Sequence, residues 1–357
     1  MSKIFALSGV GSHIMDLSEE LIAKGNHVWI MSSTNDHEDF CRETGIEFTF
    51  CDFSVQPLRM IKNIKFIQKF FKENNIDIVH CHHRTCSMYM QILSKLTGVP
   101  FVWTNHLDNI PSDFIHRKLT FYGKQAICVS SELKSFCTDK LRIPEEKISI
   151  VYNGINPKKY SFNKEYADTF KSKHNIGKQK VIGLFARMSP VKGHRNLIHA
   201  VSMLPEAMRD QFFVVFFGEE SESDYTKELR QLIKENNLEN NFIFEGFVKP
   251  DEALSICDLT VLPSSNEGMG IVTMESFLTK KLHMRTKTAG YAYFKDFCIG
   301  FDIGDDQALS EYIKDYLDGN ESKELVEAAY DFAINNCTSS IMAEKVLAIY
   351  KNALKQS

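Results

Sequence analysis

The sequence predicts an α/β protein with two doubly wound domains, and two observations support this class. Short apolar runs alternate with charged, amphipathic segments along the chain, as in β-α-β units that build parallel sheets. The chain has 357 residues, which is too long for one ordinary hydrophobic core and suits two. Residues 153–180 are polar and rich in lysine, so we place the domain boundary within them.

Candidate strands follow one another in both halves of the chain. In the first half we expect strands at 4–7, 27–31, 47–50, 78–80, 101–104 and 126–129. In the second half the same pattern predicts strands at 181–185, 213–217, 242–245, 259–262 and 282–286. Residues 340–354 carry apolar side chains at helical spacing and predict a last amphipathic helix.

Charge and cysteine content exclude several classes of function. The net charge of -4, without a long run of like charge, gives no reason to expect a nucleic-acid-binding protein. The nine cysteines show no CxxC pair and no metal-ligand spacing, which favours free thiols in a reducing compartment. The first residues lack a signal-peptide pattern, and no apolar stretch is long enough to span a bilayer. We therefore expect a cytoplasmic protein.

Two carboxylates eight residues apart, Glu267 and Glu275, flank a glycine-containing turn in the stretch E-G-M-G-I-V-T-M-E. A strand-like segment at 258–263 precedes this stretch, and a helix can begin within it or just after it. One carboxylate then lies at the C-terminal end of a strand and the other lies in the following helix. Open α/β sheets bind their ligands at this edge.

Two cations, Arg187 and Lys192, occupy a second strand-loop-helix unit, V-I-G-L-F-A-R-M-S-P-V-K-G, whose helix starts near Gly193. A diphosphate needs cations on one side, and the N-terminus of a helix adds N–H groups and a positive dipole end. Taken alone, the two residues are more typical of ordinary surface cations. Their position ahead of the two carboxylates favours a pocket for a sugar attached to a diphosphate.

A second glycine loop, S-G-V-G-S-H, follows the first predicted strand and precedes a helix expected from about Ile14. It lacks the third glycine of the dinucleotide-binding fingerprint, so its signal is weak. The cluster of His80, His82 and His83 suggests a metal, but no carboxylate or cysteine pattern completes such a site, and we expect none. His106 by itself is more typical of an ordinary histidine at the end of a strand.

Further short motifs join these stretches in a fixed order over nearly the whole chain. They are V-H-C-H at 79–82, T-N-H at 104–106, V-S-S-E at 129–132, Y-N-G-I-N at 152–156, A-R-M-S-P-V-K-G at 186–193 and E-G-F-V at 245–248. With them the chain resembles retaining glycosyltransferases of the GT-B fold, in family 4 (glycosyl transferases group 1). The resemblance implies two Rossmann-like domains facing across a cleft. These are an acceptor-side domain at 1–160, a nucleotide-sugar donor domain at 161–340, and a helix at 341–357 that returns to the first domain.

The resemblance also implies a role for each matching residue. Arg187 and Lys192 would neutralise the donor diphosphate, Glu275 would hold the ribose, and Glu267 would face the sugar. His106 would lie near the anomeric carbon, which gives a catalytic set of His106, Glu267, Arg187 and Lys192. The implied donor-binding set is Gly11, Arg187, Lys192, Gly246, Phe247, Val248, Glu267, Gly268, Met269, Gly270, Ile271 and Glu275. Here Gly11 belongs to a loop that closes under the donor, and residues 246–248 lie near the base.

The implied reaction transfers a sugar with retention from a nucleotide-sugar, most often a UDP-sugar, without a metal. The acceptor would be a glycan or a lipid-linked glycan of bacterial-type surface polysaccharide assembly. No residue is a convincing covalent nucleophile, so we expect front-side attack by the acceptor. Two alternatives stay open: a sugar-nucleotide 2-epimerase of the same fold, and a non-catalytic partner that binds nucleotide-sugars.

The chain departs from the family pattern at two places. Lys280 and Leu282 stand where the family usually has glycine and proline, and the segment through Lys287 is unusually polar because it includes His283 and Arg285. Glu219 and Glu220 follow the strand at 213–217, where small residues are usual, and carboxylates near a diphosphate are unfavourable unless they turn away or meet a cation. These departures concern the identity of the donor and the level of activity.

One predicted helix is basic and amphipathic, with Arg59, Lys62, Lys65, Lys69 and Lys72 spaced three or four residues apart. The plain interpretation is a helix that covers the sheet and exposes a solvated lysine face. The alternative is contact with anionic lipid headgroups, to which each basic residue contributes about 1 kcal/mol. In that case the protein would be peripheral at the inner face of the membrane.

Overall fold

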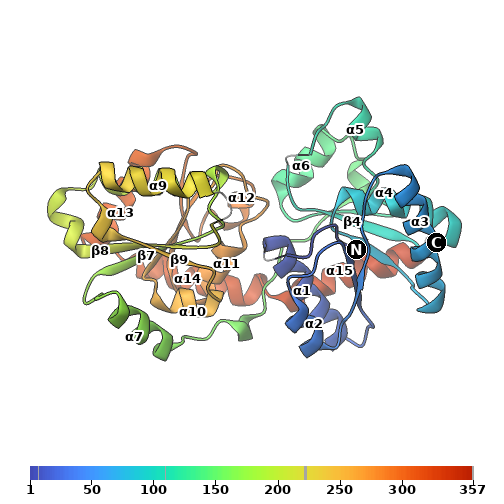
Figure 1. Cartoon of the computed structure of the whole chain (residues 1–357), viewed down its shortest axis with the longest axis horizontal. Helices are drawn as coiled ribbons and strands as arrows, with labels where there is room; N and C mark the ends of the chain where they lie inside the picture. The colour runs from blue at the N-terminus through green and yellow to red at the C-terminus, as the bar shows by residue number, and fades with distance from the viewer. Residues whose placement is uncertain (7, 109, 221–222, 356–357) are drawn as a thin grey trace. The chain divides into compact units, whose positions relative to one another are not determined.

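The computed structural model describes residues 1–6, 8–108, 110–220 and 223–355, which fold into two compact units. Unit 1 comprises Met1–Ile155 and Thr338–Ser357, and unit 2 comprises Asn156–Cys337. The chain therefore returns to unit 1 through its last helix, α15 (Ser339–Lys355), shown in red in Figure 1. Both units are α/β with parallel sheets, which confirms the predicted fold class.

Unit 2 contains a six-stranded parallel sheet in the order β12-β11-β10-β7-β8-β9 within the described residues. Its strands are β7 (Lys180–Phe185), β8 (Phe212–Phe217), β9 (Phe242–Gly246), β10 (Leu259–Leu262), β11 (Leu282–Thr286) and β12 (Ile299–Phe301). The first strand of the unit, β7, lies between β8 and β10. The chain thus builds outward to β9, crosses back beside β7, and continues to β12, which is the doubly wound arrangement.

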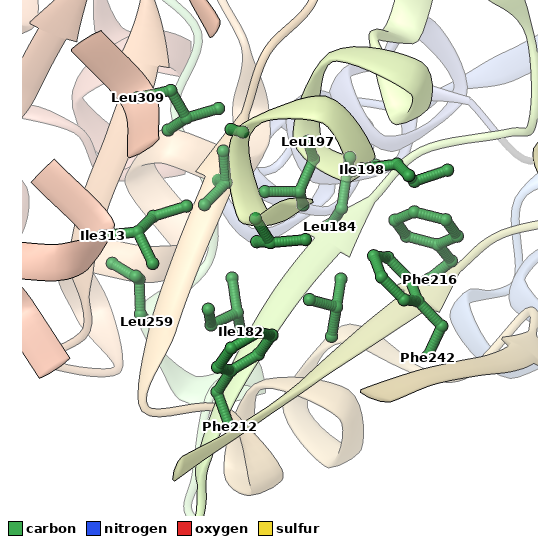
Figure 2. Close-up of a cluster of buried hydrophobic side chains, with 14 of the residues drawn as sticks. Ile182, Leu184, Leu197, Ile198, Phe212, Phe216, Phe242, Leu259, Leu309 and Ile313 are labelled. Carbon is green, nitrogen blue, oxygen red and sulfur yellow. The ribbon is translucent and has the colours of Figure 1, made fainter. Parts of the chain in front are cut away.

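Helices cover both faces of this sheet because consecutive strand residues point to opposite sides. Ile182 and Leu184 of β7 pack against Leu197 of helix α8 and Leu309 of helix α13, as Figure 2 shows. Val181 faces the other way, into a cluster with Phe170 of helix α7. The helices of unit 2 are α7 (Lys164–Lys173), α8 (His194–Ser202), α9 (Ser223–Glu235), α10 (Pro250–Ile256), α11 (Ile271–Leu278), α12 (Tyr291–Phe294), α13 (Asp306–Leu317) and α14 (Lys323–Asn336).

Unit 1 holds two separate parallel sheets among its described residues, a pair β1-β2 and a four-stranded sheet β3-β4-β5-β6. The strands are β1 (Trp29–Ser32), β2 (Glu47–Phe50), β3 (Val79–Cys81), β4 (Phe101–Asn105), β5 (Ala126–Cys128) and β6 (Ile148–Ile150). Helix α15 packs against helix α1 and strand β4. Besides α15, the helices are α1 (Gly9–Ala23), α2 (Glu38–Thr44), α3 (Pro57–Glu73), α4 (Arg84–Thr97), α5 (Phe114–Lys118) and α6 (Ser131–Asp139).

The beginning of the chain differs from the sequence prediction. Ile4 and Phe5 belong to no strand, and Leu7 lies outside the described residues. The chain instead runs past the end of β1, where the Phe5 N–H donates to Thr34 Oγ1 over 3.0 Å. Helix α1 begins at Gly9 rather than near Ile14, because the Ser8 side chain caps it by accepting from the N–H of Gly11.

The other predicted strands agree with the structure to within two residues at each end, and two strands, β6 and β12, were not predicted. Both are only three residues long, so no period-two pattern can develop within them. Within the described part of the chain, no helix combines the length and the apolar character that crossing a bilayer requires.

Candidate functional site

The carboxyl ends of β7 and β10 meet at the point where the strand order of unit 2 reverses. The loop after β7 and the loop after β10 are held together, because the N–H of Ser265 donates to the carbonyl of Val191 over 2.8 Å. Gly193 has a positive φ of 74°, and a Cβ there would lie 2.1 Å from the carbonyl oxygen of Pro263. Glycine is therefore required for this close approach, which brings the two predicted site loops side by side.

Lys192 and Glu267 form an ion pair at this edge. Lys192 Nζ donates to Glu267 Oε1 over 2.7 Å, and the two side chains are 29% and 11% exposed. Gly193 follows Lys192 and leads into α8, while Gly270 follows Glu267 and leads into α11. The structure thus brings together one cation and one carboxylate that the sequence predicted for the site.

Arg187 lies exposed in the loop after β7. Backbone hydrogen bonds fix both of its neighbours: Ala186 N–H donates to the carbonyl of Phe217, and Met188 N–H donates to the carbonyl of Glu219. The guanidinium therefore projects from a loop that is anchored on the end of β8. An exposed cationic side chain on a loop held by backbone hydrogen bonds suits the binding of a charged ligand.

Glu275 lies in α11 and is almost fully buried, with 7% exposure. Its Oε1 accepts a hydrogen bond from the hydroxyl of Tyr160 over 2.8 Å. Tyr160 comes from the start of unit 2, far from Glu275 in the sequence, and no motif in the sequence indicates this partner. The Glu275 carboxylate is therefore buried and oriented by a tyrosine hydroxyl, and it is not an exposed carboxylate on the helix surface.

Arg285, in strand β11, is fully buried and bonds to the loop between the two site carboxylates. Its Nη1 donates to the carbonyl of Met269 over 2.8 Å and to Thr273 Oγ1 over 3.1 Å. Its Nη2 donates to the carbonyl of Ala289 over 3.0 Å. The guanidinium thereby fastens the loop 267–270 to the loop at Gly290, so the unusual polarity of this strand has a structural cause.

A histidine network continues behind Arg285. His283 Nδ1 lies 2.8 Å from Thr260 Oγ1, and His283 Nε2 lies 3.0 Å from Thr273 Oγ1. Burial and the neighbouring Arg285 charge lower the pKa of His283 well below its usual value, so the ring is neutral. Thr273, in the first turn of α11, therefore contacts both Arg285 and His283 of β11.

The end of β9 lies at the same carboxyl edge of the unit 2 sheet, beside the end of β8. Gly246 has a positive φ, and its carbonyl accepts from the N–H of Gly218 over 2.6 Å. Phe247 is 54% exposed, and Val248 is partly buried. Of the two carboxylates that follow β8, Glu220 meets a cation, because Arg230 Nη2 lies 3.3 Å from its Oε1.

Two of the unusual cations after Glu275, Lys280 and Lys287, form ion pairs with carboxylates outside the two site loops. Lys280 Nζ lies 2.6 Å from Glu327 Oε2 of α14, and Lys287 Nζ lies 3.0 Å from Asp302 Oδ1. Both cations are partly exposed at the surface of unit 2. Within the segment from Lys280 to Lys287, two residues contact the loop after β10: Arg285 through the carbonyl of Met269, and Thr286, whose Oγ1 donates to the carbonyl of Ser264 over 2.6 Å.

Unit 1 contains the remaining predicted residues, His106 and Gly11. His106 follows β4 and belongs to a cluster of histidines, in which its Nε2 lies 3.2 Å from His82 Nδ1. The ring of His13 meets that of His106 edge to face at 4.9 Å between centroids, and His13 Nδ1 lies 2.9 Å from Asn153 Oδ1. Gly11 lies in the first turn of α1.

Burial controls the charge of this cluster. It lowers the pKa of His13 to about 4, against a smaller opposing effect of the hydrogen bond to Asn153. Burial and the neighbouring rings lower the pKa of His82 and of His106 well below the usual value. The three rings are therefore neutral at pH 7, and His106 can accept or donate one hydrogen bond without carrying a charge.

The histidine cluster differs in membership from the one that the sequence suggested. His83 Nδ1 is bonded to Ser2 Oγ at 2.9 Å, and His80 lies between Thr104 and Tyr350. Among the described residues, the group with metal-ligand atoms in mutual reach is His13, His82 and His106, whose atoms lie within 4.8 Å of one another. Tetrahedral zinc, with bonds of about 2.0–2.1 Å, needs ligand atoms roughly 3.3 Å apart. His82 Nδ1 and His106 Nε2, at 3.2 Å, already lie at about that separation.

Comparisons with known proteins agree with this fold. Residues 167–332 match the family described as "Glycosyl transferases group 1", and residues 7–159 match "Glycosyltransferase Family 4". A glycosyltransferase from Rickettsia africae ESF-5 has a TM-score of 0.88 at 24% identity, covering 100% of this chain and 98% of that chain. Anabaena Alr3699/HepE in complex with UDP and glucose has a TM-score of 0.84 at 18% identity, covering 98% of each chain.

A relative of known activity is the UDP-Gal:alpha-D-GlcNAc-diphosphoundecaprenol alpha-1,3-galactosyltransferase of Escherichia coli. It is 24% identical over 271 residues, which are 66% of this chain and 67% of that protein. The fold and the comparisons together define a glycosyltransferase of the GT-B type. The chain belongs to the group 1 glycosyltransferases, with a family 4 N-terminal region.

Proposed function

We propose that this glycosyltransferase transfers a sugar with retention from a UDP-sugar to a glycan or lipid-linked acceptor. Unit 2 binds the donor, and unit 1 serves the acceptor and supplies His106. The observation that carries the proposal is the ion pair of Lys192 and Glu267 at the reversal point of the strand order. Lys192 can bind a diphosphate and Glu267 can bind sugar hydroxyls, and the two lie on adjacent loops that Gly193 allows to approach closely.

The leaving group determines what the cations do. As the bond between the anomeric carbon and the phosphate oxygen breaks, negative charge grows on the UDP, and Arg187 and Lys192 stabilise it. The acceptor oxygen bonds to the same face of the anomeric carbon, and its proton passes to the departing phosphate. Glu267 holds the sugar, with the N–H groups of residues 268–271 beside the sugar and phosphate, and Glu275 accepts from the ribose hydroxyls.

The rest of the donor is held at the same edge of the sheet, at the end of β9. The base lies near Gly246, Phe247 and Val248, where exposed Phe247 offers an apolar face. Gly11 of unit 1 closes under the donor, and neutral His106 hydrogen-bonds near the anomeric carbon. The Anabaena structure with UDP and glucose, and the E. coli relative whose name specifies UDP-Gal, support UDP as the nucleotide. That relative's diphosphoundecaprenol acceptor supports a lipid-linked glycan.

A panel of nucleotide-sugars, titrated calorimetrically and followed by product analysis, tests the reaction class. A transferase hydrolyses its donor slowly alone and releases the nucleotide quickly with an acceptor, and NMR of the product shows a retained anomeric configuration. A 2-epimerase would instead return a sugar changed at C2. A binding partner would show affinity without turnover. An inverted product would contradict retention while leaving the transferase class intact.

We propose that no metal takes part, as the resemblance to family 4 glycosyltransferases of the GT-B fold implies. Turnover measured with and without EDTA tests this, and unchanged turnover is expected. If EDTA abolished activity and zinc restored it to wild type but not to His82→Ala, the cluster would be a metal site and the proposal would be wrong.

Helix α3 supports contact with an anionic membrane surface. Leu58 is 85% exposed and Ile61 is 54% exposed, beside the exposed cations Lys62 and Lys65. Arg59 is paired with Asp52 at 3.2 Å, which leaves the lysines as the main source of charge on this face. Flotation with anionic vesicles is expected for the wild type, with loss of binding for the double variant Lys62→Glu and Lys65→Glu. Equal flotation of both proteins would remove α3 from the membrane.

A further inference from the structure

Unit 2 contains a pocket at the amino edge of its sheet, which we call the amino-edge pocket. Helix α11 ends at Leu278, and the chain then turns through residues 279–281 into β11. This turn and Leu254, near the end of α10, line a cavity of about 290 Å³. The candidate donor site lies at the carboxyl edge of the same sheet, so the pocket lies at the opposite end of α11.

Aromatic rings form much of the wall of this pocket. Tyr160 and Phe162 come from the segment before α7, and Tyr330 comes from α14. Phe162 is 66% exposed, so a large apolar ring faces solvent at the pocket instead of packing in the core. Together with Leu254 and Leu278, these rings offer apolar faces against which the C–H face of a sugar ring can pack.

The charged side chains that line the pocket within the described residues are both lysines, Lys280 and Lys281. Lys280 is already paired, because its Nζ lies 2.6 Å from Glu327 Oε2. Lys281 is partly buried, and no carboxylate in the described part of the chain forms an ion pair with it. Burial lowers the pKa of Lys281, and the nearby Asp258 charge offsets only part of this effect. An anion in the pocket supplies the partner that Lys281 lacks.

Lys280 occupies its position at a cost in backbone strain. Its φ is 54°, in the left-handed region that glycine adopts freely and lysine does not. Its Nζ lies 4.6 Å from the centre of the Tyr330 ring, over the face of that ring. The glycine that the family usually has here would remove the strain and also this contact. The departure from the family pattern therefore adds a cation and holds an aromatic wall at the pocket.

The hydroxyl groups of the lining indicate what else the ligand carries. Ser255 Oγ donates to the carbonyl of Asp251 over 2.7 Å, and Thr279 Oγ1 donates to the carbonyl of Glu275 over 2.9 Å. Both hydrogens are used within the protein, so toward a ligand the two oxygens can only accept. A ligand that bonds to them brings O–H donors of its own, as a sugar does.

We propose that the amino-edge pocket binds a small anionic sugar, a monosaccharide that carries a phosphate or a carboxylate group. The aromatic wall packs against the sugar ring, Ser255 and Thr279 accept from its hydroxyls, and Lys281 pairs with its anionic group. An ammonium group serves phosphate and carboxylate alike, so the shared chemistry is an anion on a polyol.

Tyr160 connects this pocket to the candidate donor site. Its side chain lines the pocket, and its hydroxyl donates to Glu275 Oε1 over 2.8 Å. On the proposed function, on which this step rests, Glu275 accepts from the ribose of the donor. A sugar packed against Tyr160 orders the ring and lowers the entropy cost of ordering Glu275 for the ribose. The sugar then tightens UDP binding severalfold, and UDP tightens sugar binding by the same factor.

Calorimetric titration of the full chain tests the pocket with hexose monophosphates and glucuronate, beside inorganic phosphate and glucose. We expect an anionic sugar to bind more tightly than either control compound. Lys281→Gln is expected to weaken this binding about tenfold or more. Phe162→Ala should weaken it too, and this exposed position leaves the fold intact. Lys287→Gln, at an exposed lysine of the same segment, is the matched control and should bind as the wild type does.

Three results would overturn the site. One is that no anionic sugar binds, and another is that inorganic phosphate binds as tightly as any of them, which means an adventitious anion only. The third is binding that Lys192→Ala abolishes and Lys281→Gln preserves, because the sugar would then occupy the candidate donor site.

Tyr160→Phe tests the link between the two sites, since it keeps the ring in the pocket and removes the hydroxyl from Glu275. The anionic sugar should bind this variant as it binds the wild type, but should no longer tighten UDP binding. A wild-type UDP affinity that the sugar does not change would contradict the link. If UDP does not bind the wild type at all, the proposed function fails, and the sugar titrations still decide whether the pocket is a site.

Discussion

Lys192 Nζ lies 2.7 Å from Glu267 Oε1, and this contact joins the two loops that meet at the reversal point of the strand order in unit 2. The pair keeps a carboxylate and a cation partly shielded from water before any ligand arrives. A diphosphate can replace the carboxylate as partner of the lysine, and the carboxylate is then available to sugar hydroxyls.

Lys192→Ala is expected to reduce turnover by about 100-fold or more, because the leaving group loses a positive partner in the transition state. Steady-state assays of nucleotide release measure this effect. Lys227→Ala is the matched control, since Lys227 is an exposed lysine of unit 2 paired with Asp224. Wild-type turnover in Lys192→Ala would remove the lysine from the reaction.

Glu275→Ala is expected to weaken donor binding roughly ten- to a hundredfold, as befits a hydrogen bond to a charged acceptor. Tyr160→Phe removes the hydroxyl that orients the carboxylate, so its effect on the donor Kd should have the same sign and be smaller. Calorimetric titration of both variants measures the two values. A donor Kd equal to that of the wild type in Glu275→Ala would exclude the ribose contact.

Arg285→Lys is expected to destabilise the protein by about 3 kcal/mol, because a lysine keeps the charge but cannot reach the carbonyls of Met269 and Ala289 together. Urea unfolding measures the change. The donor KM should rise as well, since the loop 267–270 loses its fastening. Lys287→Arg serves as the control at an exposed position in the same segment. Unchanged stability and KM in Arg285→Lys would show that the loop holds its shape without the guanidinium.

Acid is expected to destabilise unit 1 through its buried histidines. The pKa of His13 is near 6.5 when unfolded and about 4 when folded, so between these values the unfolded chain binds more protons. Stability is therefore complete above pH 6.5 and is lost as the pH falls toward 4. At pH 5 the loss from His13 alone is about 2 kcal/mol.

Urea unfolding at pH 7 and pH 5 checks this pH dependence. In His13→Gln the difference between the two free energies of unfolding should shrink by that amount. The same difference in the variant and the wild type would mean that His13 is not protected from protons in the folded protein.

Sequence reasoning found most of the fold because long strands and helices carry their periodicity within themselves. Strand β10 and helix α15 are examples, in which the apolar spacing alone determined the type of element. It missed β12, because this strand has three residues, too few for an alternating pattern, and is recognised only by its hydrogen bonds to β11. It also predicted a strand at residues 4–7, which have the composition of a strand but no described strand pairing.

The geometry of the candidate site could be predicted where residues follow a strand end, and not where partners come from distant segments. The motif around Glu267 and the cation Lys192 were visible as local strand-loop-helix units, and the structure joins them. Tyr160 and Arg285 were missed as site residues because their roles depend on side-chain contacts to Glu275 and to the carbonyl of Met269. His13 likewise joins His106 only through the packing of α1 beside β4.

The most direct test of the central claim is calorimetric titration of the wild type and Glu275→Ala with UDP and a panel of nucleotide-sugars. We expect UDP and one UDP-sugar to bind the wild type, and Glu275→Ala to weaken both to a similar degree, because the ribose is common to them. Failure of every nucleotide and nucleotide-sugar to bind the folded wild type, or equal affinities in the two proteins, would contradict this claim.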